Sequence, residues 1–206
     1  MIDLLPHEQL TVSTYDEIAH IWSTKYHLQD FWAKEMQRFN ELLPSGKILD
    51  AGCGGARDAL GLIQYKYEYV GVDMSEALLK MARQELPQYK FYKQNIYKLE
   101  FKYRFDGFWC SAGLLHLSKN RVSEALKSIK KVMKPGAIGF ISVIDGSGEG
   151  LELEEWDDGS RHYRYFCYYS KSEFADVLSK NGLKVIDYKY RKDSDRFRWH
   201  CFYVLV

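Results

Sequence analysis

The sequence lacks closely spaced cysteines and an excess of charge of either sign. Its four cysteines, Cys53, Cys110, Cys167 and Cys201, are scattered and include no C-x-x-C pair. Disulfide frameworks and zinc sites need closer, repeated spacing, so we expect reduced thiols and no metal site. Lysine plus arginine number 29 and aspartate plus glutamate 28. No global field therefore attracts the chain to nucleic acid or to an anionic membrane.

Long apolar runs and recognisable targeting segments are also missing. The longest apolar run, Gly136 to Ile144, is less than half of a membrane span. The opening segment, MIDLLPHEQL, lacks the basic stretch and apolar block of a signal peptide. Hydrophobic residues make up 46% of the chain and charged residues 28%, which excludes a disordered or collagen-like chain. We expect a cytoplasmic, globular protein with a single domain.

Short apolar runs alternate with helical patterns from residue 47 onward. The runs predicted to be strands are 47–52, 69–74, 90–94, 105–112, 137–144, 184–191 and 199–206. This alternation predicts an α/β fold with a doubly wound, mostly parallel sheet covered by helices on both faces. The segment 192–197 between the last two strands is too short for a parallel crossover, so one strand at the end of the chain is predicted to be antiparallel.

Helix signals complete this organisation. Ser75 is a predicted N-cap, and Ser170 with Glu173 forms a capping-box pattern. Residues 1–46 are predicted to form an N-terminal helical cap of the same domain. Residues 47–206 are predicted to form a Rossmann-like domain with a hairpin insertion near 147–170.

The strongest motif is ILDAGCGGARDAL at 48–60, in which an apolar strand leads into Asp50, then Gly52, Gly54 and Gly55, and then a helix. Glycines let the backbone turn tightly and approach a ligand closely, and the free N–H groups of a helix start favour a polar or anionic group. Ligands of open parallel sheets bind at the carboxyl ends of the strands. The sequence therefore predicts a nucleotide-type site at this turn.

Asp73 ends the second strand, 23 residues after Asp50. An acidic residue at this distance from a glycine turn commonly binds ribose hydroxyls. A dinucleotide fingerprint, G-x-G-x-x-G, has a third glycine beside the pyrophosphate. Arg57 occupies that position here. A ligand with a ribose but no pyrophosphate therefore fits better than NAD.

These motifs, followed by FDGFWCSAGLLHL (105–117) and KPG (134–136), resemble those of class I S-adenosylmethionine-dependent methyltransferases, in particular the small stand-alone bacterial-type branch. The resemblance covers residues 15–206. It implies a seven-stranded sheet in the order 3-2-1-4-5-7-6 with strand 7 antiparallel, and S-adenosylmethionine as the cofactor. It also implies methyl transfer by in-line displacement.

The resemblance assigns roles position by position. Asp50, Gly52, Cys53 and Gly54 would surround the methionine part of the cofactor, with Ser111 on its other side. Asp73 would bind the ribose, and Met74, Asn95 and Ile96 would surround the adenine. Two positions depart from the family pattern: Ala56 replaces a third glycine, and Asn95 replaces the usual aspartate, although an amide oxygen can still accept from the adenine amino group.

The acceptor side offers one candidate base and a possible aromatic cover. His116, just beyond the fourth strand, could remove a proton from the acceptor; alternatively it is a polar residue satisfied at a helix start. Tyr15 and Trp22 could close over the cofactor and acceptor, where aromatic faces suit a sulfonium cation; alternatively they only pack the N-terminal helix. Arg57 and Asp58 could contact either ligand or form an exposed ion pair.

The segment 147–170 contains LELEEW, the turn signal Asp158-Gly159 and RHYRYF, which together predict a β-hairpin. Its place after the fifth strand puts it on the ligand side, so Arg161, Tyr163 and Arg164 are candidate substrate contacts. The alternative is a solvated hairpin with cross-strand ion pairs.

Several functions fit these observations. The preferred one is a methyltransferase with a small-molecule acceptor, no membrane partner and no nucleic-acid partner. The alternatives are a methyltransferase acting on protein or RNA, a nucleotide-binding oxidoreductase, and a non-catalytic cofactor-binding regulator. The sequence specifies neither the acceptor nor an oligomeric state.

Overall fold

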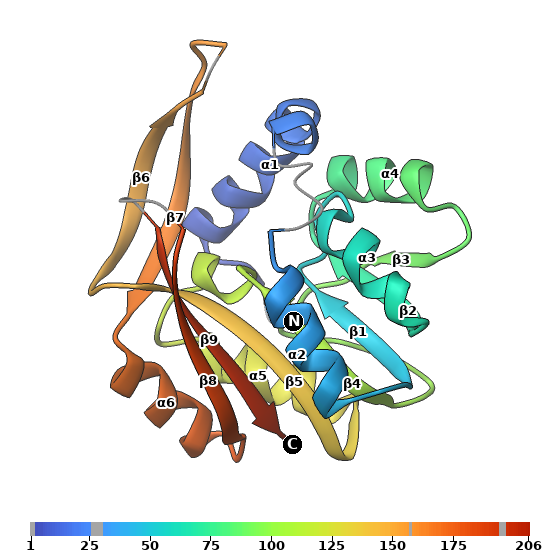
Figure 1. Cartoon of the computed structure of the whole chain (residues 1–206). Helices are drawn as coiled ribbons and strands as arrows, with labels where there is room; N and C mark the ends of the chain where they lie inside the picture. The colour runs from blue at the N-terminus through green and yellow to red at the C-terminus, as the bar shows by residue number, and fades with distance from the viewer. Residues whose placement is uncertain (1–2, 26–30, 157, 194–196) are drawn as a thin grey trace.

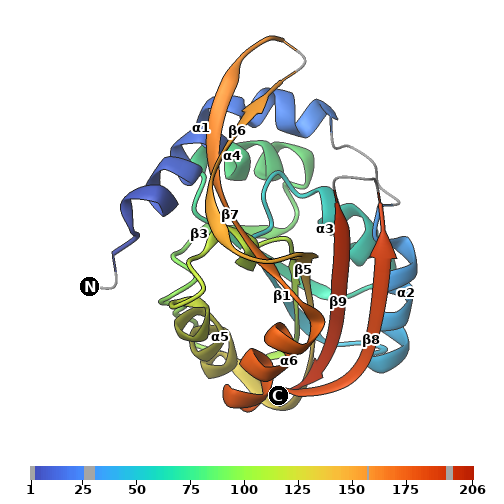
Figure 2. The ribbon, with the colours of Figure 1, turned by 90° about the vertical axis from the view of Figure 1, so that its left-hand side faces the viewer.

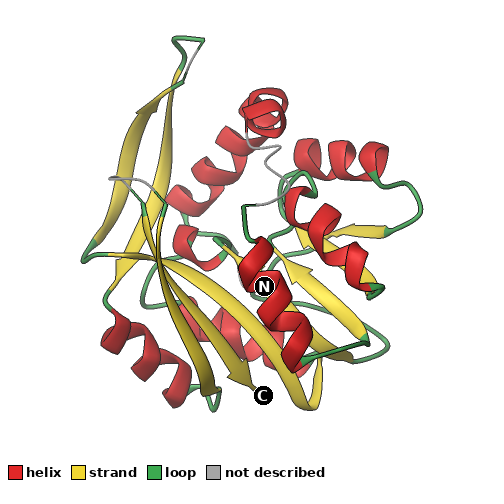
Figure 3. Cartoon of the chain, in the orientation of Figure 1, coloured by secondary structure: helices red, strands yellow, loops and turns green. Residues whose placement is uncertain are grey.

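A central β-sheet carries helices on both of its faces (Figure 1, Figure 3). The computed structural model describes residues 3–25, 31–156, 158–193 and 197–206. The helices are α1 (Pro6–Lys25), α2 (Ala33–Leu42), α3 (Arg57–Leu62), α4 (Glu76–Glu85), α5 (Val122–Lys131) and α6 (Lys171–Lys180), with short 3₁₀ helices at Ile63–Tyr65 and Leu114–His116. The strands are β1 (Lys47–Ala51), β2 (Glu68–Asp73), β3 (Lys90–Lys93), β4 (Phe105–Ser111), β5 (Met133–Asp145), β6 (Glu149–Glu155), β7 (Arg161–Tyr169), β8 (Lys184–Lys192) and β9 (Arg198–Leu205).

The main sheet has the strand order β3-β2-β1-β4-β5-β9-β8. Strands β1 to β5 pair in parallel, and β9 runs antiparallel to both β5 and β8. The predicted order of seven strands with the last one antiparallel is thus confirmed. Residues 194–196, in the connection between β8 and β9, lie outside the described residues.

β6 and β7 form an antiparallel hairpin where the sequence predicted one. The structure adds one pairing to the predicted sheet, because β7 also joins it through a short parallel pairing with the end of β5. β5 begins at Met133, four residues earlier than predicted, because Met133 pairs with Phe105 on β4 ahead of a bulge. The hairpin projects beyond the body of the protein, beside α1 (Figure 1).

The two faces of the sheet follow from alternation along each strand, since successive side chains point to opposite sides. On β1, Ile48 belongs to the core layer beneath α2, α3 and α4, where it shares the layer with Phe39 and Leu79. Its neighbour Leu49 belongs to the opposite layer, with Phe174 of α6 and residues of α5. Both layers are apolar, as helices covering both faces of a parallel sheet require.

Helix α1 packs against α4 on one side and β7 on the other, and Figure 2 shows it beside the hairpin. Toward β7, the Thr14 hydroxyl donates to the Tyr163 carbonyl at 2.8 Å. Toward α4, the Asp16 carboxylate accepts from the Ser75 hydroxyl at 2.6 Å and from the Ala77 N–H at 3.0 Å. Asp16 thereby joins Ser75 in capping the start of α4. Helix α1 thus connects α4 with β7.

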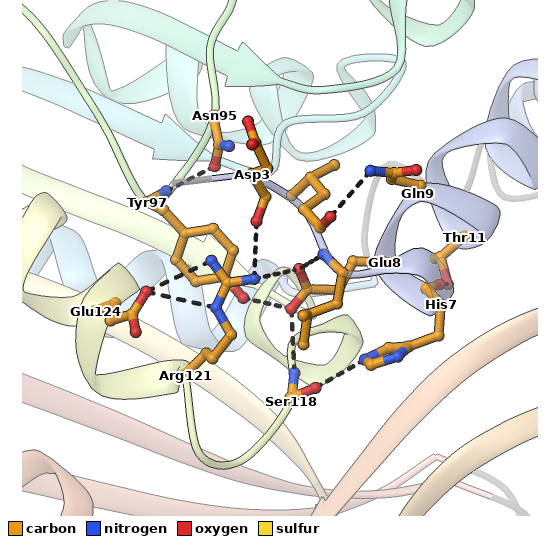
Figure 4. A network of polar contacts seen from close by, with 12 residues as sticks. Asp3, His7, Glu8, Gln9, Thr11, Asn95, Tyr97, Ser118, Arg121 and Glu124 are labelled. Carbon is orange, nitrogen blue, oxygen red and sulfur yellow. Dashed lines mark hydrogen bonds and ion pairs between the residues drawn. The ribbon is translucent and has the colours of Figure 1, made fainter. Parts of the chain in front are cut away.

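A buried carboxylate at the start of α1 fixes this helix to the sheet domain (Figure 4). Glu8 is only 2% exposed. It accepts hydrogen bonds from the Tyr97 hydroxyl at 2.5 Å and the Leu5 N–H at 2.9 Å, and it forms an ion pair with Arg121 at 3.0 Å. A buried charge needs such pairing, because removal from water is costly.

The predicted helix starts are confirmed. The Ser75 side chain accepts from the Leu78 N–H at the start of α4, and Ser170 with Glu173 forms a complete capping box at the start of α6. Within the described ranges, none of the helices combines the length and apolar character that crossing a membrane requires.

Candidate functional site

A cavity of about 250 Å³ lies at the carboxyl ends of the parallel strands and is covered by α1. Most of the residues predicted for the site line it: Tyr15, Trp22, Asp50, Gly52, Cys53, Gly54, Asp73, Met74, Ile96, Ser111, His116 and Arg164. Arg57 and Asp58 line it as well. In the part of the chain that the structure describes, histidine, cysteine, aspartate and glutamate form no group that could hold a metal ion.

The glycine turn after β1 forms one wall of the cavity. Gly52 and Gly54 have φ angles of +88° and +52°, in the left-handed region that favours glycine. The N–H groups of Gly52 and Cys53 both donate to the Val72 carbonyl, which ties the turn to the end of β2. Ala56 has a φ of +73°, so the alanine that replaces the family's third glycine occupies a backbone conformation that costs an L residue about 1–2 kcal/mol.

Asp73 joins this turn to α4. Its carboxylate accepts from the Gly54 N–H at 2.8 Å and from the Ser75 N–H at 2.9 Å. Burial raises the pKa of Asp73, and these backbone hydrogen bonds oppose the rise. A carboxylate has about four acceptor positions, so Asp73 can still accept hydrogen bonds from a ligand in the cavity.

Asp50 and Ser111 lie near the ends of the neighbouring strands β1 and β4 and also line the cavity. Asp50 is buried and accepts from the Tyr69 hydroxyl at 2.6 Å. Burial, reinforced by the nearby Asp58, raises its pKa well above the usual value. The Ser111 hydroxyl is buried and has no hydrogen-bond partner among the described residues. An orphaned hydroxyl in a ligand-sized cavity is typical of a group that a ligand satisfies.

A chain of hydrogen bonds lines the cavity on the side of the β6–β7 hairpin. Arg164 donates to Glu154 at 2.5 Å and to the Tyr15 hydroxyl at 2.6 Å. Tyr15 and the Nε2 atom of His116 are 2.8 Å apart, and His116 Nδ1 lies 2.7 Å from the Tyr165 carbonyl oxygen. Because a carbonyl only accepts, Nδ1 carries the proton and Nε2 accepts from Tyr15. The candidate base is therefore engaged at both ring nitrogens.

This environment keeps His116 neutral. Burial, together with the charge of Arg164, lowers its pKa to about 3. An unperturbed histidine ionises near pH 6.5, and the sequence could not reveal the adjacent guanidinium or the loss of solvent that lower the pKa of His116.

Because the pKa of His116 is low in the folded protein, we expect the free energy of unfolding to decrease as the pH is lowered. Below about pH 6.5 the unfolded chain binds a proton on this ring, whereas the folded protein does not until about pH 3. Between pH 7 and 5, urea denaturation should show wild type losing about 1–2 kcal/mol more stability than His116→Gln. Equal losses in wild type and His116→Gln would contradict the assigned environment.

Three predicted residues are not brought to the cavity. The Asn95 side chain accepts from the Tyr97 N–H at 2.9 Å, as Figure 4 shows, and so stabilises its own turn. Arg161 and Tyr163 are exposed. They lie two residues apart on β7 and share its outward face, whereas Arg164 points inward. Only the inward residue of the predicted trio lines the cavity.

The cavity also has aromatic walls that the sequence analysis did not assign to a ligand. They include Phe31, Trp32, Phe166, Phe197 and Trp199. A signal for Trp199 was present in the sequence: an antiparallel last strand begins at the edge where the parallel strands end. Phe31 and Trp32 belong to the apolar pattern of residues 1–46, which is equally typical of helices packed on the domain and of helices packed over its ligand.

Comparison with known proteins gives a consistent result. Residues 48–136 match the family described as "Methyltransferase domain". The chain is 31% identical over 137 residues to YqeM of Bacillus subtilis (strain 168), which is provisionally named a methyltransferase; the match covers 64% of this chain and 53% of YqeM. It is 32% identical over 154 residues to a tRNA (carboxymethyluridine(34)-5-O)-methyltransferase of Arabidopsis thaliana, covering 72% of this chain and 36% of that protein. The matched regions thus span about half or less of these two relatives.

A solved structure shares the fold. The 1,6-didemethyltoxoflavin-N1-methyltransferase of Burkholderia thailandensis, with 1,6-didemethyltoxoflavin and S-adenosylhomocysteine bound, aligns with a TM-score of 0.74. The alignment covers 100% of this chain and 92% of that one, at 19% sequence identity.

Proposed function

Because the chain belongs to the class I S-adenosylmethionine-dependent methyltransferases, we propose that it is an enzyme that transfers the methyl group of S-adenosylmethionine to a small-molecule acceptor. The observation that carries the proposal is one cavity with two different halves. One half has the glycine turn, Asp73 and the orphaned Ser111 hydroxyl. The other has the Tyr15–His116–Arg164 chain and the aromatic walls.

The residues of the first half fit the cofactor. A Cβ at Gly52 would come within 3.2 Å of the Gly113 backbone, and one at Gly113 within 2.9 Å of the Ala51 carbonyl oxygen, so neither position has room for a side chain. We assign the backbone at Gly52 and Gly54 to the methionine part, with Asp50 and Cys53 beside it, and Ser111 to its polar end. Asp73 is assigned to the ribose hydroxyls.

The adenine needs flat apolar surfaces and one or two polar groups. Met74, Leu78 and Ile96 line the cavity next to Asp73 and supply the apolar surfaces. Gln94 also lines the cavity, but its amide is engaged like that of Asn95: it donates to the Glu100 carbonyl at 3.2 Å and accepts from the Glu100 N–H at 2.9 Å. We therefore assign no side-chain amide to the edge of the base.

The cofactor supplies a methyl group on a sulfonium, whose leaving thioether needs little assistance. The chain's own residues then have to hold the acceptor in line and exclude water. Neutral His116 accepts from Tyr15, and Tyr15 accepts from Arg164. We propose that these three hydrogen-bonded side chains orient the acceptor. His116 is not assigned the role of a base, because both of its nitrogens are engaged and its pKa is about 3.

The alternative functions are less well supported. The similarity to a tRNA methyltransferase favours RNA as an acceptor, but the net charge of +1 and a cavity covered by α1 favour a small molecule. An oxidoreductase is disfavoured because Arg57 begins α3 in the place of the third glycine of a dinucleotide fingerprint. Arg57 pairs there with Asp58 at 2.7 Å. We retain the cytoplasm as the proposed location, where the four buried cysteines would stay reduced.

Calorimetry and turnover test the proposal. We expect S-adenosylmethionine and its demethylated product to bind, and NAD not to bind. Labelled methyl groups should then pass to the small-molecule fraction of a cell extract and not to its RNA or protein. Binding of NAD alone would indicate an oxidoreductase. Cofactor binding without any transfer would indicate a regulator.

A further inference from the structure

The second half of the cavity has an unusual wall. Seven aromatic side chains line it from segments far apart in sequence: Tyr15, Trp22, Phe31, Trp32, Phe166, Phe197 and Trp199. Trp32 and Trp199 meet edge to face, with ring centroids 5.4 Å apart. Such walls offer flat contact surfaces with little conformational freedom, which suit a flat ligand.

Two hydrogen-bond donors in this wall are unused. The indole N–H groups of Trp32 and Trp199 are buried and have no partner among the described residues. The Trp32 side chain is 1% and Trp199 7% exposed. Buried N–H groups are almost always paired, and the cavity is the space that both rings border. A ligand with hydrogen-bond acceptors would satisfy them.

Arginines neutralise two carboxylates that line the cavity near this wall. Asp58 accepts from Arg57 and from the Trp109 indole, at 2.7 and 2.9 Å. Asp193 pairs with Arg191 at 3.8 Å. The wall therefore combines carboxylates already paired with arginines and two indole N–H groups without a partner among the described residues, which favours a ligand that accepts hydrogen bonds.

An aromatic wall can also bind cations, but arginines of the chain itself occupy these rings. Arg164 lies over Trp22 and Phe166, at 5.0 Å from each ring centroid. Arg191 lies over Phe31 at 4.2 Å and over Trp32 at 4.9 Å. A cationic amine would meet like charges here, so a neutral or anionic ligand is favoured.

On the premise that the proposed function is correct, we infer that the methyl acceptor is a flat aromatic or heteroaromatic molecule bearing oxygen atoms, and that the indole N–H groups of Trp32 and Trp199 bind those oxygens. The two tryptophans are specificity-determining residues of the acceptor subsite. Neither is assigned to the cofactor.

Calorimetry on the full chain saturated with S-adenosylhomocysteine tests this inference, with 2-naphthol as the probe. Two related compounds isolate the features claimed: decahydro-2-naphthol is not flat, and 1-naphthylmethylamine is flat but cationic. We expect 2-naphthol to bind at least tenfold more tightly than either. Trp199→Phe and, separately, Trp32→Phe keep a ring but remove the N–H. Each should weaken 2-naphthol binding about three- to tenfold and leave the affinity for S-adenosylhomocysteine within twofold of wild type.

Tyr169→Phe is the matched control. It removes a buried hydroxyl that, like the two indole N–H groups, has no partner among the described residues. Tyr169 does not line the cavity, so both affinities should be unchanged. Equal binding of the three compounds, or unchanged 2-naphthol binding by both tryptophan variants, would overturn the inference and leave the methyltransferase proposal intact. Failure of S-adenosylhomocysteine itself to bind would overturn both. If Trp32→Phe does not fold, the more peripheral Trp199→Phe decides.

Discussion

Asp73→Ala is expected to weaken the binding of S-adenosylhomocysteine by a factor of about 10–150, or about 1.5–3 kcal/mol. Two losses combine. The charge-assisted hydrogen bonds proposed for the ribose disappear, and so do the acceptors for the Gly54 and Ser75 N–H groups. The glycine turn would then lose its tie to α4. Titration calorimetry of the folded variant measures the effect.

Asp73→Asn separates these two contributions. One amide oxygen can still accept from a backbone N–H, so the turn should be better preserved than in the alanine variant, while the charge is lost. We expect an intermediate affinity. Asp176→Ala, which removes an exposed carboxylate from α6, should leave binding unchanged. A dissociation constant for Asp73→Ala within twofold of wild type would remove the ribose assignment.

Arg164→Met is expected to lower the free energy of unfolding by about 3–5 kcal/mol. The Arg164 side chain is 5% exposed and pairs with Glu154, which is 8% exposed. Removing the guanidinium leaves a buried carboxylate without its cation and Tyr15 without a donor. The stacking of Arg164 on Trp22 and Phe166 is lost as well. Urea denaturation monitored by circular dichroism measures the change.

The same strand provides the control. Arg161 also pairs with a glutamate, Glu155, but their side chains are 64% and 67% exposed. Arg161→Met should therefore change stability by no more than about 0.5 kcal/mol. In the double variant Arg164→Met with Glu154→Leu, no uncompensated charge remains, and part of the loss should be recovered. A loss below about 1 kcal/mol for Arg164→Met would show that the pair is solvated in solution.

The sequence by itself determined the seven strands of the main sheet and the edge of the sheet at which the cavity lies. These features depend on local signals: apolar runs, helix caps, and the tight turn that needs Gly52 and Gly54. The order of the strands came from the resemblance to a known family. The carboxyl ends of parallel strands meet at one edge of the sheet. Once Asp50, Asp73 and Ser111 were placed at strand ends, their convergence on one cavity followed without any knowledge of packing.

The sequence did not determine which side chains of the hairpin point toward the cavity. Arg161, Tyr163 and Arg164 are close in sequence, and composition alone does not separate them. On a strand they fall on opposite faces, and only the docking of β7 against α1 decided that the face of Arg164 is the inner one. Asn95 was likewise assigned from a family pattern, but local hydrogen bonding to the Tyr97 N–H turned its side chain into its own turn.

Only the tertiary structure decided the acceptor half and the state of His116. Tyr15 and His116 are 101 positions apart in sequence, and Tyr15 and Arg164 are 149 apart. Their hydrogen bonds exist because α1, the segment after β4 and the hairpin pack around one cavity. Burial and a neighbouring guanidinium set the pKa of His116, and both result from this packing. No local pattern in the sequence contains either quantity, since each is a property of residues brought together from distant parts of the chain.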